Sequence, residues 1–171
     1  MSAAPDPVRD AARLAEIAEL DLLGDEVDAM LQQIAAEAAT TLRLPISLVS
    51  VVLDEALFVA ASHGLTGWVA EVRGHPVEWS FCATSVRTRQ EYVVSDAASD
   101  PATKDNPMVT REGARCYAGV PLISSRGFVL GNLCVVGGEP RAFTAAELDT
   151  LRALGRKAIG HIEGRRPRTT A

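Results

Sequence analysis

RCYAGVPL (residues 115–122) and LGNLCVV (residues 130–136) are two apolar stretches separated by the turn sequence SSRG (residues 124–127). Gly and Ser tolerate the tight backbone of a short connection, so the pattern predicts two neighbouring strands joined as a hairpin. In such a pair Cys116 and Cys134 could be neighbours. The alternative is that both are reduced thiols that fill the core, the usual state of cysteines in a cytosolic protein.

Helical patterns lie on both sides of this strand region. Residues 9–23 and 25–42 carry apolar side chains at the spacing of a helix and are separated by Gly24. Near the other end, Thr144 and Glu147 form a capping-box sequence, in which each side chain satisfies a backbone amide beside the other. This signal predicts a helix that begins at Thr144 and continues to about residue 162.

The middle of the chain carries shorter signals. Ser80 is placed to cap a short helix that ends near Thr88. The stretches 64–77 and 97–111 contain Gly, Pro, Asn and Asp and are predicted to be loops. Strands gathered between terminal helices indicate an α+β fold. Apolar runs predict its further strands at residues 46–53, 57–61 and 91–94.

A series of short motifs resembles the GAF family of sensory domains, in the branch found in bacterial signalling proteins. The motifs are SFC (80–82), Asp96, NPMV (106–109), YAGVPL (117–122) and GNLCV (131–135). The resemblance implies a central antiparallel β-sheet with the terminal helices on one face. On the other face it implies short helices and loops over a ligand cavity, as in GAF and PAS domains.

The resemblance and the helical patterns together divide the chain into three parts. Residues 1–24 are expected to be an N-terminal leader helix, residues 25–163 the GAF domain, and residues 164–171 a flexible basic tail. The tail contains Arg165, Arg166 and Arg168, which we expect to be solvated. Members of the family commonly pair through their terminal helices, so the resemblance also implies a homodimer.

Composition and charge exclude several classes of protein. The chain has 171 residues, 47% hydrophobic and 23% charged, which is typical of one globular domain. Its net charge of −5 argues against a nucleic-acid-binding protein. Neither a membrane-spanning run nor a signal peptide is evident, so we expect a cytoplasmic location. No cofactor and no metal site can be assigned from the sequence.

The residues expected around a ligand are polar or aromatic, and each has a plain structural alternative. Tyr117 and Asn132 either face a polar pocket or satisfy neighbouring groups inside the fold. By strand alternation Asn132 should share a sheet face with Leu130 and Cys134. Asp96 either accepts a ligand donor or caps the segment after it. The full candidate set is Trp79, Phe81, Cys82, Asp96, Tyr117 and Asn132.

Cys82 is the candidate with redox chemistry. It lies in the first turn of the expected helix, where backbone amides favour a thiolate. The alternative is a small apolar side chain that packs the helix onto the sheet. Trp79 and Phe81 either stack on a planar ligand or pack in the core.

The sequence favours a non-catalytic sensory module over an enzyme. We find no phosphate-binding loop, dinucleotide fingerprint or nucleophile elbow. The expected function is therefore regulatory: binding of an unidentified small molecule, dimerisation, or both, in bacterial signal transduction with a protein partner. The alternative is a thiol-based redox sensor, or an enzyme like the free methionine sulfoxide reductases of the family, that uses Cys82.

Overall fold

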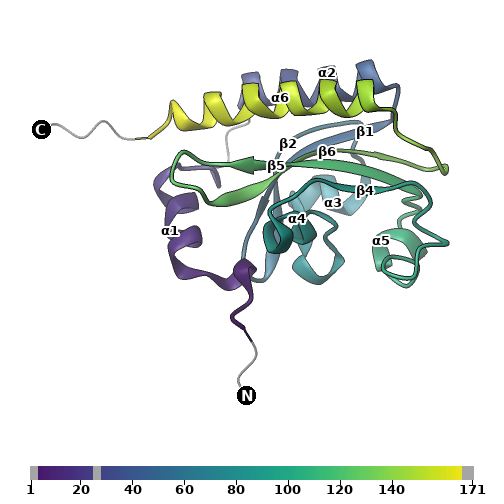
Figure 1. Ribbon diagram of the computed structural model, residues 1–171, viewed down its shortest axis with the longest axis horizontal. Coiled ribbons are helices and arrows are strands. Elements are labelled where there is room, and N and C mark those ends of the chain that lie inside the picture. Colours follow the sequence, from purple (N-terminus) through teal and green to yellow (C-terminus); the bar gives the residue numbers. More distant parts are fainter. Residues whose placement is uncertain (1–3, 25–27, 167–171) are drawn as a thin grey trace, which may run out of the picture.

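The computed structural model describes residues 4–24 and 28–166, and within these ranges it contains one antiparallel sheet of six strands (Figure 1). The strand order across the sheet is β3-β2-β1-β6-β5-β4. The predicted hairpin is confirmed, because β5 and β6 pair along their whole length. The strands are β1 Ile46–Val52, β2 Ala56–His63, β3 Gly74–Pro76, β4 Tyr92–Val94, β5 Cys116–Ile123 and β6 Val129–Gly137.

Helices cover both faces of this sheet. The long helices α2 (Ala29–Leu42) and α6 (Ala145–Glu163) lie side by side on one face. The short helices α3 (Gly67–Val72), α4 (Cys82–Thr88) and α5 (Pro107–Thr110) lie on the other. Helix α1 (Ala11–Glu19) flanks the turn end of the β5–β6 hairpin (Figure 1). Two single 3₁₀ turns, η1 (Pro7–Arg9) and η2 (Val77–Trp79), precede α1 and α4. The predicted α+β fold class is confirmed.

Local capping signals decide where the two long helices begin. The Asp28 side chain accepts hydrogen bonds from the amides of Met30 and Leu31, so α2 starts after Asp28. The beginning of the predicted helix, residues 25–27, lies outside the described residues. At α6 the capping box is present as predicted, with Thr144 and Glu147 bonded to each other's backbone amides.

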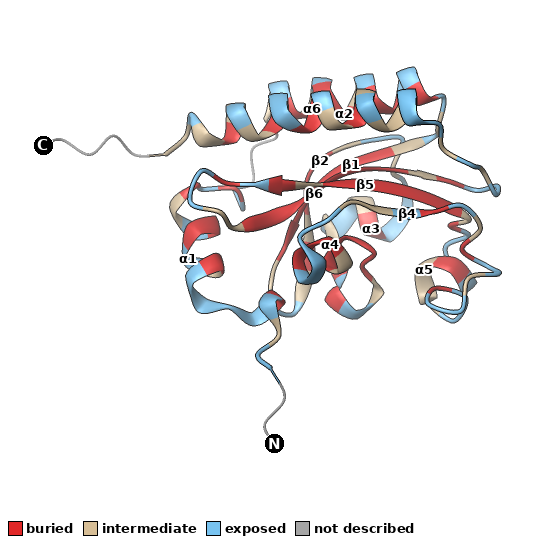
Figure 2. Cartoon of the chain, viewed as in Figure 1, coloured by how far each residue is buried: buried red, intermediate tan, exposed pale blue. Residues whose placement is uncertain are grey.

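The two faces of the sheet carry separate hydrophobic clusters. Under α2 and α6 the sheet contributes alternate residues such as Val120, Leu133 and Val135. Under α4 and α5 it contributes Tyr117 and Cys134. Figure 2 shows the same division, since α2 and α6 turn their buried stripe toward the sheet and their exposed stripe away from it. Strands β5 and β6 therefore contact both clusters through neighbouring residues.

The structure differs from the sequence prediction in the loops and in one strand. The stretch 64–77, predicted to be a loop, contains α3 and β3, because β3 adds to the edge of β2 with His75 opposite Leu57. The expected helix 9–23 is shorter and is preceded by η1. Gly131 pairs with Leu122 and Val129 pairs with Ile123, so Leu130 between them has no partner on β5 and forms a β-bulge. This bulge places Leu130 in the α2–α6 cluster, so the prediction that it shares a face with Asn132 is wrong.

None of the described helices is both long and apolar enough to cross a membrane. The division into leader, domain and tail stays a prediction. In the structure α1 packs onto the rest of the chain through buried Arg13, Glu16 and Ile17. The Arg13 guanidinium donates to the carbonyl oxygen of Val129 in β6 at 3.1 Å, which attaches α1 to the sheet.

Candidate functional site

A buried polar cluster lies between α4 and the sheet. Asn132 on β6 donates from Nδ2 to the hydroxyl of Tyr117 on β5 at 3.0 Å and to that of Ser85 on α4 at 3.1 Å. The Tyr117 hydroxyl is 3.1 Å from the Sγ atom of Cys82, and Cys134 Sγ is 4.0 Å from the same sulfur. These five side chains, all buried, form what we call the thiol cluster: Cys82, Ser85, Tyr117, Asn132 and Cys134.

Gly119 makes room for this cluster. A Cβ atom at Gly119 would lie 2.3 Å from the Tyr117 hydroxyl oxygen and 2.8 Å from Asn132 Nδ2, closer than any real contact. The Tyr117 side chain thus lies across a position on its own strand where no side chain is tolerated. The Oδ1 atom of Asn132 has no hydrogen-bond partner within the described residues. A buried carbonyl oxygen without a donor is unfavourable by about 1–3 kcal/mol.

The cluster shifts the acidity of its two thiols in opposite directions. The thiol of Cys134 lowers the pKa of Cys82 to about 7, against the effect of burial and with help from the hydroxyls of Ser50 and Tyr117. The pKa of Cys134 is raised well above its ordinary value by the interaction with Cys82 and by burial.

A small cavity adjoins the cluster. Its volume is about 40 Å³, enough for a molecule of very few atoms, since one water needs about 10–15 Å³. It reaches the surface beside the half-buried side chains of Trp79 and Met108. The lining is mainly apolar: Leu48, Leu57, His75, Trp79, Ser80, Phe81, Cys82, Met108, Ala114, Tyr117, Cys134 and Val136.

Residues from α3 and from the segment after α5 pack around Trp79, one of the residues that line this cavity. Trp68 donates from Nε1 to the Glu112 carboxylate at 2.8 Å and packs edge-on against Trp79, with ring centroids 5.7 Å apart. The Arg111 guanidinium lies over the Trp79 ring, 5.8 Å from its centroid. Burial lowers the pKa of His75 in the lining, which favours its neutral form. No Asp, Glu, Lys or Arg side chain lines the cavity, and the thiol in its lining whose pKa is lowered is that of Cys82.

The structure brings five of the six sequence-predicted site residues together. Trp79, Phe81, Cys82 and Tyr117 line the cavity, and Asn132 lies behind Tyr117. Phe81 packs edge-on against Tyr117, with centroids 5.2 Å apart. Asp96 is elsewhere: it follows β4, and its carboxylate accepts a hydrogen bond from Ser99 Oγ at 2.9 Å.

Several residues of the site were not predicted. Cys134 was not in the candidate set, although strand alternation could have added it, because it lies two residues after Asn132 on β6. Ser50, Ser85 and His75 carry no local signal, since they reach the cluster or the cavity only through packing of distant segments. Gly119 belongs to the YAGVPL motif, but its steric role depends on where the Tyr117 side chain lies.

Cys116 and Cys134 are not neighbours; both are free, buried thiols, which is the alternative that the sequence left open. Cys116 pairs with Gly137 and Cys134 with Gly119, an offset of three residues that places the two side chains on opposite faces of the sheet. Cys116 packs near Leu44, beyond the end of α2, and burial raises the pKa of its thiol. The thiol next to Cys134 is that of Cys82, and the three cysteines are free.

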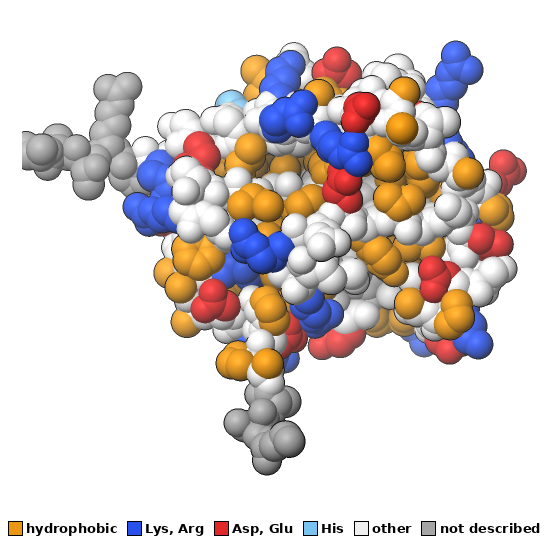
Figure 3. Space-filling view, in the orientation of Figure 1, with side chains coloured by type: hydrophobic (Ala, Val, Ile, Leu, Met, Phe, Trp, Pro, Cys, Tyr) orange, Lys and Arg blue, Asp and Glu red, His pale blue; other side chains and the backbone are white. Residues whose placement is uncertain are grey.

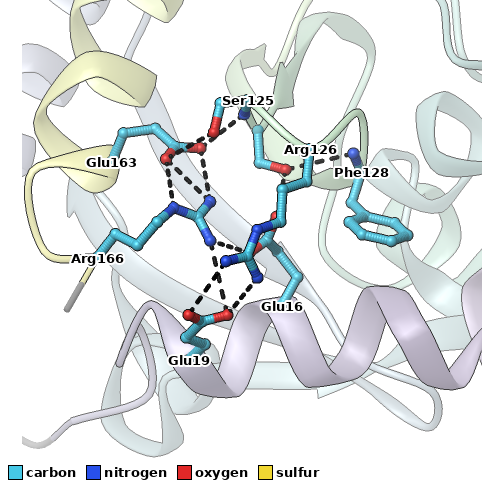
Figure 4. A network of polar contacts seen from close by, with 8 residues as sticks. Glu16, Glu19, Ser125, Arg126, Phe128, Glu163 and Arg166 are labelled. Carbon is cyan, nitrogen blue, oxygen red and sulfur yellow. Dashed lines mark hydrogen bonds and ion pairs between the residues drawn. The ribbon is translucent and has the colours of Figure 1, made fainter. Parts of the chain in front are cut away.

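A second polar network ties the chain ends together (Figure 4). We call it the terminal clasp: Glu16 and Glu19 of α1, Arg126 of the β5–β6 turn, and Glu163 and Arg166 at the end of α6. Within it, Arg166 contacts Glu16 at 2.6 Å, and Arg126 contacts Glu19 at 2.6 Å. Glu163 accepts from the Ser125 backbone amide at 2.7 Å. The clasp thus joins three segments that are far apart in the sequence.

Glu16 is the buried member of the clasp. Its side chain is only 1% exposed, and it accepts a hydrogen bond from Ser124 Oγ at 2.7 Å. Arg166 lowers its pKa, opposing the effect of burial, and Ser124 lowers it further. Arg165 makes an ion pair with Asp28 at the start of α2. Arg165 and Arg166 thus differ from the solvated tail that we expected, whose remaining residues, 167–171, lie outside the described ranges.

Comparison with known proteins identifies the family. A family model described as "GAF domain" matches residues 24–159. The chain belongs to the GAF domain family. It is also 36% identical over 142 residues to the cyclic di-GMP phosphodiesterase PA2567 of Pseudomonas aeruginosa, covering 82% of this chain and 23% of that protein. The chain spans about a quarter of the length of this curated relative.

Solved GAF structures share the fold at low sequence identity. The GAF domain/HD domain protein of Geobacter sulfurreducens superposes with a TM-score of 0.66 at 20% identity, covering 85% of this chain and 97% of that one. The free methionine-R-sulfoxide reductase of Neisseria meningitidis superposes with a TM-score of 0.60 at 19% identity, covering 96% and 92%. These likenesses support the GAF fold. Within the described ranges, no group of three or more His, Cys, Asp or Glu side chains is placed to hold a metal ion.

Proposed function

We propose that this chain is a non-catalytic regulatory module of bacterial signalling that takes a small, uncharged molecule into the cavity under α4. The observation that carries the proposal is the cavity itself, which brings five candidate residues together and adjoins the thiol cluster. Its volume of about 40 Å³ is far below the roughly 300–1,000 Å³ of sites for drug-sized ligands. The guest is accordingly a molecule of few non-hydrogen atoms.

Strands β5 and β6 provide the physical connection from this cavity to the terminal helices. Tyr117 and Cys134 face the cavity, while Val120, Leu133 and Val135 pack under α2 and α6. A guest that binds one conformation of these strands better than another shifts the population between them. We propose that the output is a change in the packing of α2 and α6 on the sheet.

An NMR titration with small neutral probes tests the input. We expect dimethyl sulfoxide or isopropanol to shift the resonances of Cys82, Tyr117 and Ala114, and to change the rate of amide exchange in α6. Ala114→Leu adds volume at the cavity wall and should abolish the shifts. Ala153→Leu, the same change on the exposed face of α6, should leave them intact. Equal titration of both variants would exclude the cavity as the site.

A homodimer is a second proposed role, favoured by an apolar groove between α6 and β5. The groove contains Val120, Pro121, Ile123, Gly155 and Ile159, and it is flanked by the paired charges of Arg152 and Glu91. Ile123 is 37% exposed at its edge. Figure 3 shows apolar side chains between paired basic and acidic ones on the face toward the viewer.

Sedimentation velocity over a range of concentrations tests the dimer. Compared with the wild-type chain, Ile123→Glu should shift the monomer–dimer equilibrium toward monomer. Val72→Glu, at a highly exposed position on α3 across the sheet, is the matched control and should have no effect. A wild-type chain that stays monomeric at high concentration would rule out a dimer through this groove.

The relatives suggest where such a module acts. The part of the Pseudomonas phosphodiesterase that matches this chain is a fraction of that enzyme. We propose that this chain regulates a signalling protein of that kind rather than catalysing a reaction. The rival function is reduction of free methionine sulfoxide with Cys82. Consumption of free methionine-R-sulfoxide in the presence of dithiothreitol, lost in Cys82→Ser, would support the rival and overturn the non-catalytic role.

A further inference from the structure

We propose that Cys82 and Cys134 are a hydrogen peroxide-reactive pair that closes to a reversible disulfide between α4 and β6. The two Sγ atoms are 4.0 Å apart and can bond to each other directly, with no linking group between them. A disulfide requires about 2.05 Å, so the sulfurs must approach by roughly 2 Å, a distance that side-chain rotation and a small shift of α4 can supply. This inference rests on the two thiols and does not depend on a ligand for the module.

The cavity supplies both room and access for the oxidant. Cys82 and Cys134 both line it, and it reaches the surface beside Trp79 and Met108. Its volume of about 40 Å³ exceeds the roughly 10–15 Å³ that one water requires. Hydrogen peroxide has two oxygen atoms and no charge, and therefore fits both the size and the mainly apolar lining. A bulky organic hydroperoxide is excluded by the same volume.

The geometry assigns different roles to the two sulfurs. Cys82 Sγ has the Tyr117 hydroxyl at 3.1 Å, and because Asn132 Nδ2 donates to that hydroxyl, its own hydrogen is left to point at the sulfur. This arrangement favours the thiolate of Cys82, which is the nucleophilic form. Cys134 Sγ, 4.0 Å from Cys82 Sγ, is placed to react second. Cys116 lies on the opposite face of the sheet and takes no part.

The chemistry is a two-electron oxidation with hydrogen peroxide as the acceptor. The Cys82 thiolate attacks one peroxide oxygen, the O–O bond breaks, and the departing hydroxide takes up the proton that Cys82 released and becomes water. Cys82 is then a sulfenic acid. Cys134 Sγ attacks the Cys82 sulfur, the S–O bond breaks, and hydroxide leaves with the Cys134 proton as a second water. An external dithiol then reduces the disulfide by thiol–disulfide exchange, restoring both thiols while it becomes a disulfide itself.

Formation of the disulfide should change the fold locally, where α4 packs on the sheet. Closing the bond draws the first residue of α4 toward β6 and separates Cys82 from the Tyr117 hydroxyl. The Tyr117 hydroxyl then loses its contact with Cys82 in a buried site, where an unmet hydrogen bond is unfavourable. Oxidation should therefore change the packing of α4 while the α2–α6 face stays folded.

Peroxide treatment of the complete, folded chain tests the pair. After a small molar excess of hydrogen peroxide, we expect two of the three thiols to disappear and the intact mass to fall by two hydrogens. Non-reducing peptide mapping should join the Cys82 peptide to the Cys134 peptide, and dithiothreitol should restore both thiols. Cys116→Ser is the matched control and should give the same cross-link.

Two variants separate the steps. Cys134→Ser should stop at a Cys82 sulfenic acid that dimedone labels, and Cys82→Ser should give neither label nor cross-link. Differential alkylation of the wild-type chain provides a measurement that needs no variant: Cys82 should be oxidised at least tenfold faster than Cys116. A cross-link that includes Cys116, or equal oxidation of all three thiols only after unfolding, would overturn the proposal.

Discussion

The thiol cluster and the terminal clasp are both polar networks anchored on β5, β6 and the turn between them, but they are built from opposite chemistry. The thiol cluster contains no carboxylate, guanidinium or ammonium group, and all of its side chains are buried. The clasp consists of carboxylates and guanidinium groups, and except for Glu16 its members are partly exposed. The cluster is therefore expected to respond to oxidants and to uncharged guests, and the clasp to pH and salt.

The difference has an energetic basis. Inside the fold, a charge is unfavourable by several kcal/mol unless it is fully paired, whereas hydroxyl, amide and thiol groups need only a hydrogen bond each. At the edge of the sheet, water solvates the free sides of Arg126 and Glu19. Glu16 is tolerated because Arg166 and Ser124 both bond to its carboxylate. The protein thus keeps its charges where α1, the turn and α6 meet.

The largest expected effect is on the thiol cluster, from Gly119→Ala. The added methyl group collides with the Tyr117 hydroxyl and with Asn132 Nδ2. Overpacking together with broken buried hydrogen bonds should lower the free energy of unfolding by about 2–4 kcal/mol in urea denaturation. Gly160→Ala on α6, where an added Cβ meets nothing, is the control and should raise stability by about 0.5–1 kcal/mol. A Gly119→Ala chain as stable as the wild type would show that Tyr117 does not lie across Gly119.

Glu16→Gln in the clasp should have the next largest effect. It leaves Arg166 without its buried partner and should lower the free energy of unfolding by about 1.5–3 kcal/mol at neutral pH. Glu19→Gln changes the 35%-exposed carboxylate one turn later and should lower it by less than about 1 kcal/mol. Equal losses for the two variants in parallel chemical denaturation would argue against a special role for burial of Glu16.

Tyr117→Phe should have a smaller effect on stability and a specific effect on chemistry. It removes one hydroxyl, which should lower the free energy of unfolding by about 1–2 kcal/mol. It also removes a donor to Cys82, so the pH profile of Cys82 alkylation should move to higher pH. Tyr92→Phe, at a half-buried position on β4, is the control. An unchanged alkylation profile in Tyr117→Phe would contradict the proposed orientation of the hydroxyl.

The last prediction is about stability at acidic pH. Its effect is the smallest at neutral pH, but it separates the two networks most sharply. The pKa of Glu16 is lowered by Arg166, and the pKa of Glu163 is lowered by the Ser125 amide and Arg166 against the effect of burial. Carboxyl groups with lowered pKa stabilise the fold above their ordinary range, and this contribution is lost as pH falls through the folded-state pKa.

The wild-type chain should therefore lose stability steeply below about pH 4.5, the ordinary range of Glu. Glu16→Gln should flatten this loss, which thermal melting between neutral and acidic pH can measure. Asp28 contributes at still lower pH, since its pKa of about 2 results from the Leu31 amide, His161 and Arg165 overcoming burial. A Glu16→Gln chain with an unchanged pH dependence would mean that another carboxylate dominates.

Much of the fold could be predicted because its signals are local. The capping box of Thr144 and Glu147 acts within one helical turn, and the hairpin follows from two apolar runs around a Ser-Gly turn. The motifs around Tyr117 and Asn132 located the site within the chain, and alternation was enough to place Cys134 on the face of Asn132. Predictions failed where packing of distant segments decides, as in β3, which becomes a strand only because the edge of β2 is open to it.

The sequence, through its patterns and its resemblance to GAF domains, predicted an antiparallel sheet with helices from both ends on one face, and five of the six candidate residues that lie at the other face. Only the tertiary structure decided which sulfur is beside which, because the register of β5 and β6 separates Cys116 from Cys134 and the packing of α4 brings Cys82 to Cys134. It also decided that Arg166 pairs with Glu16 across 150 positions. Side-chain periodicity specifies the face on which a residue lies, whereas contacts between faces depend on how whole elements pack.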